Sequence, residues 1–223
     1  MKRKKKVGVR NIPTKRISVR GKMYSYKNKM VVYHESLLER NYFYMLEIDD
    51  DVIKYLPQPL KIDTYVPDVL VERKDKKQLV EIKPLEKVKN MDDKLAKKIE
   101  TLKQYCQENN MEFLIITEED INQNILQVSM ALHQHTQTKV PAEYKEKILE
   151  IVKDYEKISF QDLFNSLTTY YDVYDLIENA KIKGYVLSLI ANKELKIINI
   201  ENGLNSNTLI CINQTWGLAN DRN

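Results

Sequence analysis

Asp68, Glu81 and Lys83 are the residues of this sequence whose types and spacing most suggest catalysis. They fall on two short apolar segments, residues 66–71 and 79–84, and the charged residues between these segments predict a tight turn. Side chains alternate between the two faces of a strand, so Glu81 and Lys83 share one face. If the two strands pair as a hairpin, Asp68 and Glu81 meet at one end of the sheet. The pattern therefore predicts two carboxylates and an ammonium group in one cluster.

A purely structural explanation of the same residues competes with the catalytic one. Asp68 follows Pro67 and could belong to a turn, while Glu81 and Lys83 could form a solvated strand face. Two features favour catalysis: both segments are strongly apolar, as in buried strands, and acidic residues are uncommon in strands. Short charged patterns also arise by chance, so the spacing alone leaves both explanations open.

Glu39 is a third candidate carboxylate, on a helix expected at residues 35–48. Ser36 and Glu39 have the spacing of a capping box, in which the glutamate reaches back to the Ser36 amide. Glu39 also borders the apolar stripe of this helix, so it could point across the sheet towards the two strand acids. Both roles fit the spacing, and Glu35 is an alternative acid.

Three carboxylates near a lysine suit hydrolysis of a phosphodiester. Hard oxygen ligands select Mg²⁺ or Mn²⁺ over zinc. The metal would activate a water molecule and neutralise charge on the scissile phosphate. Lys83 would orient or help to deprotonate that water, or offset the developing charge.

The order of elements predicts two domains. Hydrophobic periodicity in the first half gives a mixed sheet of mostly antiparallel strands with flanking helices, an α/β arrangement. The expected segments are strands at 29–33, 52–56, 60–65, 66–71, 79–84 and 112–117, and helices at 35–48, 92–109 and from Thr117 to about Leu132. Residues 133–142 are polar, lack periodicity and contain a proline, so the linker is expected there. We therefore predict a basic N-terminal arm with the first strand at 1–34, a catalytic domain at 35–135 and a second domain at 136–223.

The second domain has the element order of a winged helix. Three helices are expected, at 143–155, at 160–167 and from about 171 to 191 with an interruption near Gly184, followed by a hairpin at 195–200 and 208–212. Residues 141–223 contain nine Lys or Arg and twelve acidic residues. A domain that reads duplex DNA normally has a basic recognition face. The charge therefore favours a protein partner for this domain.

Charge is distributed unevenly along the chain. Residues 1–34 contain twelve Lys or Arg and no acid, whereas the remainder carries a net charge of −8. Such a basic arm is suited to holding a phosphate backbone, although it could also be a solubilising tail. No secretory signal and no apolar run of membrane-spanning length is present, and two distant cysteines do not suggest a disulfide. The expected location is a reducing cytosol, with no membrane partner.

Residues 31–84 resemble the TnsA endonuclease subunit of heteromeric cut-and-paste transposases. The resemblance rests on VVYHESLLERNYFYMLEID, YLPQPLKI, YVPDVLV and VEIKP, which occur in the family's order and spacing. It implies a restriction-endonuclease-like fold of the PD-(D/E)xK kind, with Glu39, Asp68 and Glu81 as metal-binding catalytic acids and Lys83 as the catalytic lysine. It also implies Mg²⁺ as cofactor, with Mn²⁺ as a substitute. Some relatives carry Gln in the place of Glu81.

The resemblance further implies a role in DNA transposition. Proteins of this kind cut the 5′ ends of the transposon, a DDE-type transposase cuts and joins the 3′ ends, and an AAA+ ATPase regulator docks on the nuclease. The expected partners are thus transposon-end DNA, the transposase and the regulator, the last on the C-terminal domain. Two alternatives are a stand-alone restriction or repair nuclease, and a non-catalytic adaptor that bridges DNA and a regulator.

Overall fold

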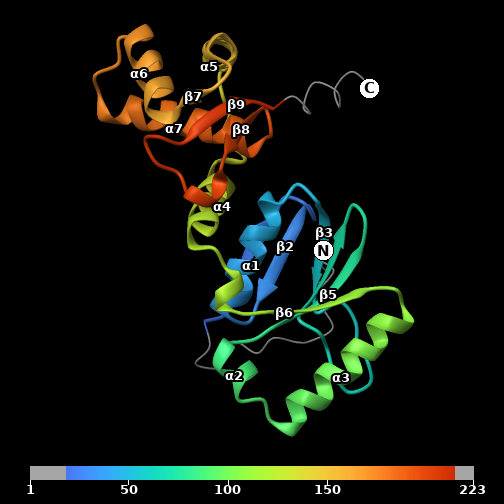
Figure 1. Ribbon diagram of the computed structural model, residues 1–223. Helices are drawn as coiled ribbons and strands as arrows, with labels where there is room; N and C mark the ends of the chain where they lie inside the picture. Colours follow the sequence, from blue (N-terminus) through green and yellow to red (C-terminus); the bar gives the residue numbers. More distant parts are fainter. Residues whose placement is uncertain (1–18, 214–223) are drawn as a thin grey trace, which may run out of the picture. The chain divides into compact units, whose positions relative to one another are not determined.

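The structure is a computed structural model that describes residues 19–213 (Figure 1). Contacts within the chain define two compact units, which meet between Ile121 and Asn122. The predicted basic arm lies for its first 18 residues outside the described part, so its binding role stays a prediction. No helix within residues 19–213 combines the length and apolar character needed to cross a membrane.

From residue 19 onward, the first unit is built from a four-stranded sheet, a separate hairpin and three α-helices. The four-stranded sheet has the order β3-β4-β5-β6, with β5 and β6 parallel and the other neighbours antiparallel. A parallel β5–β6 pair requires a crossover between the two strands, and α2 and α3 lie in it. The elements are β1 (Gly21–Ser25), β2 (Met30–His34), α1 (Leu37–Ile48), β3 (Val52–Pro57), β4 (Val69–Arg73), β5 (Lys77–Ile82), α2 (Leu85–Lys89), α3 (Asp93–Glu108), β6 (Glu112–Ile116) and the 3-10 turn η1 (Glu118–Asp120).

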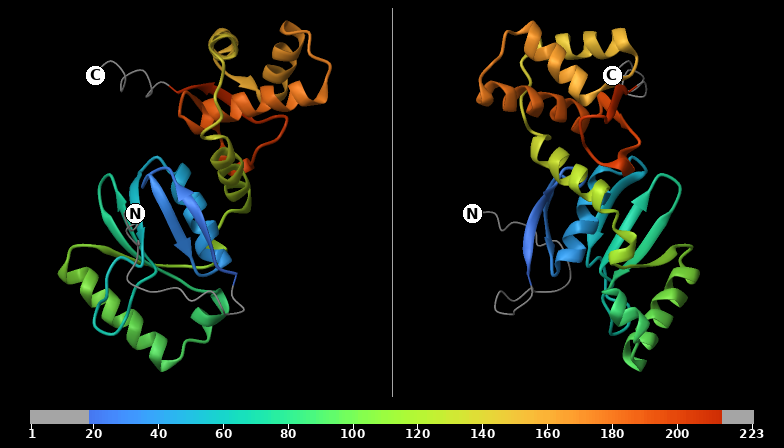
Figure 2. Two further views of the ribbon diagram at one scale, coloured as in Figure 1. Left: turned by 180° about the vertical axis from the view of Figure 1, so that it is seen from behind. Right: turned by 60° about the vertical axis from the view of Figure 1, so that its left-hand side comes forward.

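Helices α1 and α3 cover opposite faces of this sheet (Figure 1). On one face, Phe43 of α1 packs against Tyr55 of β3, with ring centroids 5.3 Å apart. On the other, Leu79 of β5 forms a buried cluster with Leu102 and Cys106 of α3. The β1–β2 hairpin lies beside α1 and contacts it through both strands (Figure 2). The expected mixed sheet with flanking helices is confirmed.

Two sequence predictions in this unit are wrong. Residues 60–65 form no strand but only an isolated bridge between Ile62 and Tyr65, and the backbone has positive φ angles at Gln58 and Asp63 on either side of Ile62. Thr117 caps the short turn η1 rather than a long helix, because its hydroxyl and the Asp120 carboxylate form a closed capping box. The strand β1 was not predicted at all.

The second unit combines helices with a three-stranded sheet of order β7-β9-β8. Its elements are α4 (Gln123–His135), α5 (Ala142–Tyr155), β7 (Ile158–Ser159), α6 (Phe160–Tyr170), α7 (Leu176–Ala191), β8 (Leu195–Ile198), the 3-10 turn η2 (Ile200–Asn202) and β9 (Leu209–Ile212). Asn122 caps α4, and this helix packs along α7. For that reason α4 lies with the second unit, although the boundary expected from the sequence falls at its C-terminal end.

Helix α7 is continuous through Gly184, where an interruption was expected. The glycine is explained by close packing, since a Cβ atom there would come within 3.2 Å of the His135 ring on α4. A helix-interior glycine costs about 1 kcal/mol relative to alanine, which here is offset by the approach of two helices. Cys106 and Cys211 are both free thiols, as expected.

Candidate active site

The β4–β5 hairpin brings Asp68, Glu81 and Lys83 into one cluster, as the alternation of side chains predicts. Val69 pairs with Val80, so Asp68 and Glu81 lie next to each other at the end of the hairpin. The Lys83 Nζ atom lies 2.8 Å from Asp68 Oδ2 and 2.6 Å from Glu81 Oε1. Asp68 Oδ2 also accepts a hydrogen bond from the Ile82 amide, at 2.8 Å, which fixes the carboxylate against the second strand.

Glu81 is completely buried, so the idea of a solvated strand face is wrong for this residue. Its side chain points to the sheet face that α3 covers, and Lys98 of that helix donates to the same Oε1 atom that Lys83 contacts. The other oxygen, Oε2, is buried and has no hydrogen-bond partner within the described residues. Burying a carboxylate with one unpaired oxygen and two ammonium neighbours costs free energy of folding. A cluster that is retained despite this cost is a candidate functional site.

Lys98 is a member of the cluster that the sequence prediction missed. It lies three residues after Leu95 and four before Leu102, a position on the apolar stripe of its helix. A lysine at a core-facing position was the available signal, because a buried charge needs a partner. The side chain is 13% exposed and is directed to Glu81.

Glu39 caps the start of α1 and is also electrostatically linked to the cluster. The Ser36 hydroxyl accepts from the Glu39 amide at 3.1 Å and donates to Glu39 Oε1 at 3.2 Å. Glu39 Oε2 accepts from the amide of Glu35, at 2.7 Å, rather than from the Ser36 amide that was expected. Burial raises the pKa of Glu39 to about 7, and the negative charge of Asp68 adds to this effect. The charge of Asp68 therefore acts on the Glu39 carboxylate while this side chain remains in its helix cap.

The charges of the cluster depend on one another. Burial raises the pKa of Glu81, and the charge of Asp68 raises it further, while Lys83 and Lys98 oppose the shift. Burial alone would lower the pKa of Lys83, but the carboxylates of Asp68 and Glu81 more than compensate, so it is raised. The lysine is thereby held as an ammonium ion between the two acids.

The residues present fit a hard divalent cation in their chemistry. The Lys83 ammonium group already lies within 2.8 Å of two carboxylates, so one cation can bind both acids together. The unpartnered Glu81 Oε2 supplies a further oxygen donor. Within residues 19–213, however, no three acidic, histidine or cysteine side chains are arranged together as a ready ligand set. Glu39, the third expected ligand, is held by its hydrogen bonds in the helix cap.

One known protein family matches part of this chain. No curated protein matches the sequence significantly. Residues 33–118 match the family model described as the TnsA-like endonuclease N-terminal domain, and this range contains all four predicted site residues and Lys98. The match points to a nuclease. We conclude that residues 33–118 of this chain are a TnsA-like endonuclease N-terminal domain.

Proposed function

We propose that this chain is a Mg²⁺-dependent DNA endonuclease that cuts the 5′ ends of a transposon during cut-and-paste transposition. The observation that carries the proposal is the buried Glu81 carboxylate, which shares Lys83 with Asp68 inside a TnsA-like endonuclease domain. Asp68, Glu81 and Glu39 would hold the metal, with Mn²⁺ as a substitute. A bound divalent cation would supply an activated water molecule and neutralise charge on the phosphate.

Each side chain of the cluster would have a distinct role in the reaction. Asp68 and Glu81 hold the ammonium groups of Lys83 and Lys98 at the end of the hairpin, where the scissile phosphate would lie. Lys83 would donate a hydrogen bond to the phosphate or to the attacking water, because its ammonium group is already positioned between the two acids. In the reaction, the water oxygen forms a bond to phosphorus and its proton passes to solvent, while the bond from phosphorus to the leaving sugar oxygen breaks and that oxygen takes up a proton from solvent.

The second unit would act as a winged-helix docking domain for protein partners. The order α5, β7, α6, α7, β8, β9 supports this proposal, because it contains three helices and a small antiparallel sheet. An apolar patch at the start of α7 is also exposed, with Tyr174, Leu176 and Ile177 at 86%, 85% and 70%. Exposed patches of this kind mark protein-interaction sites. The proposed partners are a DDE-type transposase and an AAA+ ATPase regulator, in a prokaryotic cytoplasm, with transposon-end DNA as substrate.

Substitution of Asp68 tests the proposed function. Asp68→Ala, and the isosteric Asp68→Asn, should reduce 5′-strand cleavage to background in a reaction reconstituted with the partner proteins, while partner binding persists. Asp75→Asn is the matched control, because Asp75 is an exposed acid in the turn at the other end of the same hairpin. Strand-resolved gel analysis measures the cuts. Undiminished 5′-strand cleavage by either Asp68 variant would refute the assignment.

The same reaction separates the two alternative functions. A stand-alone restriction or repair nuclease would cut DNA equally well without the partner proteins, whereas the proposed nuclease requires them. A non-catalytic adaptor would support the reaction after Glu81→Ala and would bind no divalent metal. Calorimetric titration with Mn²⁺ distinguishes the adaptor from both nucleases.

A further inference from the structure

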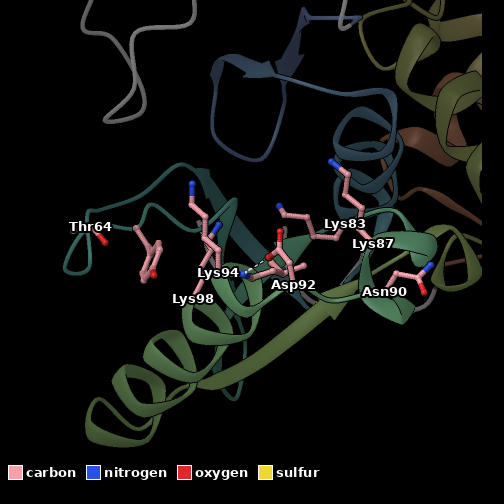
Figure 3. Close-up of a pocket in the computed structure, with 9 residues that line it drawn as sticks. Thr64, Lys83, Lys87, Asn90, Asp92, Lys94 and Lys98 are labelled. Carbon is pink, nitrogen blue, oxygen red and sulfur yellow. Dashed lines mark hydrogen bonds between the residues drawn. The ribbon is translucent and has the colours of Figure 1, made fainter.

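A basic pocket of about 710 Å³ opens beside the catalytic cluster. Figure 3 shows that its lining comes from the end of β5, from α2, from the N-terminal half of α3 and from the loop at Thr64. Four of the lining residues are lysines: Lys83, Lys87, Lys94 and Lys98. Lys83 and Lys98 are the two ammonium groups that contact Glu81, so the pocket wall is continuous with the cluster.

The charge of this pocket selects an anion. Asp92 also lines it, but its carboxylate is committed to the cap of α3, where it accepts from the Leu95 amide at 2.7 Å. Lys94 and Lys98 are one helical turn apart, about 6 Å along the axis, on the same side of α3. They can therefore contact successive negative charges along an extended chain, rather than one compact ion.

The remaining wall suits the uncharged parts of a nucleotide chain. Tyr65 and Leu95 give the pocket an apolar surface against which a sugar or a base can pack. Asn90 adds an amide that can both donate and accept hydrogen bonds. Alternating charged and apolar groups are what the sugar-phosphate backbone offers.

We propose that this pocket binds the backbone of the DNA strand being cut, on one side of the scissile phosphate. Lys87, Lys94 and Lys98 contact its phosphates, and Lys98 connects this contact to the Glu81 carboxylate. The inference rests on the proposed function, because Lys83 belongs both to the proposed catalytic cluster and to the lining of this pocket. It assigns a DNA-binding role to Lys87, Lys94 and Lys98, none of which is among the four site residues predicted from the sequence.

The test removes two pocket charges that lie away from Glu81. The variant Lys87→Gln/Lys94→Gln is compared with Lys97→Gln/Lys103→Gln, which removes two exposed lysines of α3 that do not line the pocket. Both are made in the full chain, and folding is checked by circular dichroism. The affinity for a short fluorescent duplex of arbitrary sequence is measured against salt concentration, with Ca²⁺ in place of Mg²⁺ to prevent cleavage.

Each lost contact with a duplex phosphate should reduce the magnitude of the negative slope of log affinity against log salt by about 0.9. The slope of the pocket variant should therefore be shallower by about 1.8, with correspondingly slower cleavage, while the control keeps the wild-type values. Acetylation of surface lysines, read by mass spectrometry, should show protection of Lys87 and Lys94 by bound DNA and no protection of Lys97.

The outcomes separate this inference from the proposed function. If the wild-type chain binds and cuts DNA but the pocket variant behaves like the control, and Lys87 and Lys94 are not protected, the pocket assignment is overturned and the nuclease stands. If the reconstituted wild-type protein does not cut DNA, the proposed function fails and the pocket assignment fails with it.

Discussion

Glu81 is the residue on which the electrostatic balance of the cluster depends. It is fully buried, and its Oε1 atom contacts the ammonium groups of both Lys83 and Lys98, which are themselves only 23% and 13% exposed. Lys83 has a second carboxylate in Asp68. Removing the negative charge at Glu81 would therefore affect Lys98 more than Lys83.

We predict that Glu81→Ala destabilises the first unit by about 3 kcal/mol, because breaking a buried ion pair leaves an uncompensated charge. Glu81→Gln should cost less, since it preserves the shape of the side chain and one acceptor oxygen. Hydrogen exchange of peptides from β5, read by mass spectrometry, measures the change within this unit. Equal losses for the two variants would show that the charge of Glu81 is not what stabilises the cluster.

The predicted members of the site were those that local pattern can identify. Asp68, Glu81 and Lys83 lie within one hairpin, so strand alternation was sufficient to place them together. Glu39 was ambiguous because a helix cap and a catalytic acid fit the same spacing; the structure shows the cap, and the charge of Asp68 raises the pKa of the same carboxyl group. Lys98 was missed because it reaches Glu81 through the packing of α3 on the sheet, which no local pattern records.

At the scale of elements, the Glu47 carboxylate joins three of them. Near the end of α1 it accepts hydrogen bonds from the Ser25 hydroxyl of β1 at 2.6 Å, from the Tyr26 amide at 2.9 Å and from the Tyr55 hydroxyl of β3 at 2.8 Å. Ser25 and Tyr55 are almost completely buried. This carboxylate therefore holds the β1–β2 hairpin against the helix that carries Glu39.

Glu47→Ala should destabilise the first unit by about 2–4 kcal/mol, because two buried hydroxyl groups lose their acceptor. The effect should be largest in β1 and β2, measured by hydrogen exchange of their peptides. Glu47→Gln is the control, since its amide oxygen can still accept. If exchange in β1 and β2 is unchanged in Glu47→Ala, the hairpin is held by other contacts.

Helices α1 and α3 were predictable because apolar residues recur along them at helical spacing. Strands β5 and β6 were predictable because their segments are short and strongly apolar. The strand β1 was missed because its short, polar sequence becomes a strand only by pairing with β2. Two capping residues, Thr117 and Asn122, lie five positions apart. The apolar periodicity continues across both of them, so a single long helix was predicted. Thr117 starts one turn and Asn122 starts the following helix.

At the scale of the whole molecule, α4 completes the second unit. The Ser188 hydroxyl of α7 donates to the Thr138 carbonyl at 2.8 Å, and the Asn192 side chain donates to the Thr136 carbonyl at 3.2 Å. Together with the contact of His135 over Gly184, these bonds attach α4 and the segment after it to α7. The linker expected from composition at 133–142 is thus partly helical and partly bound to the second unit.

We predict that a fragment of residues 122–223 folds cooperatively by itself, and that a fragment of residues 136–223 is less stable by at least about 2 kcal/mol. The shorter fragment lacks α4, and the loss corresponds to at least one large apolar side chain left uncovered. Urea unfolding followed by circular dichroism compares the two. Equal stability would mean that α4 contributes nothing to this unit.

The hydrogen bond from the Ile82 amide to Asp68 gives the candidate site a spectroscopic probe of its own. A backbone amide that donates to a carboxylate has a chemical shift and an exchange rate that depend on the charge and position of that carboxylate. Any cation, phosphate or inhibitor that engages Asp68 would therefore change the nuclear magnetic resonance signal of Ile82, even when the rest of β5 does not move. Ligand binding could be followed at Asp68 itself, without a cleavage assay and without modifying any residue of the cluster.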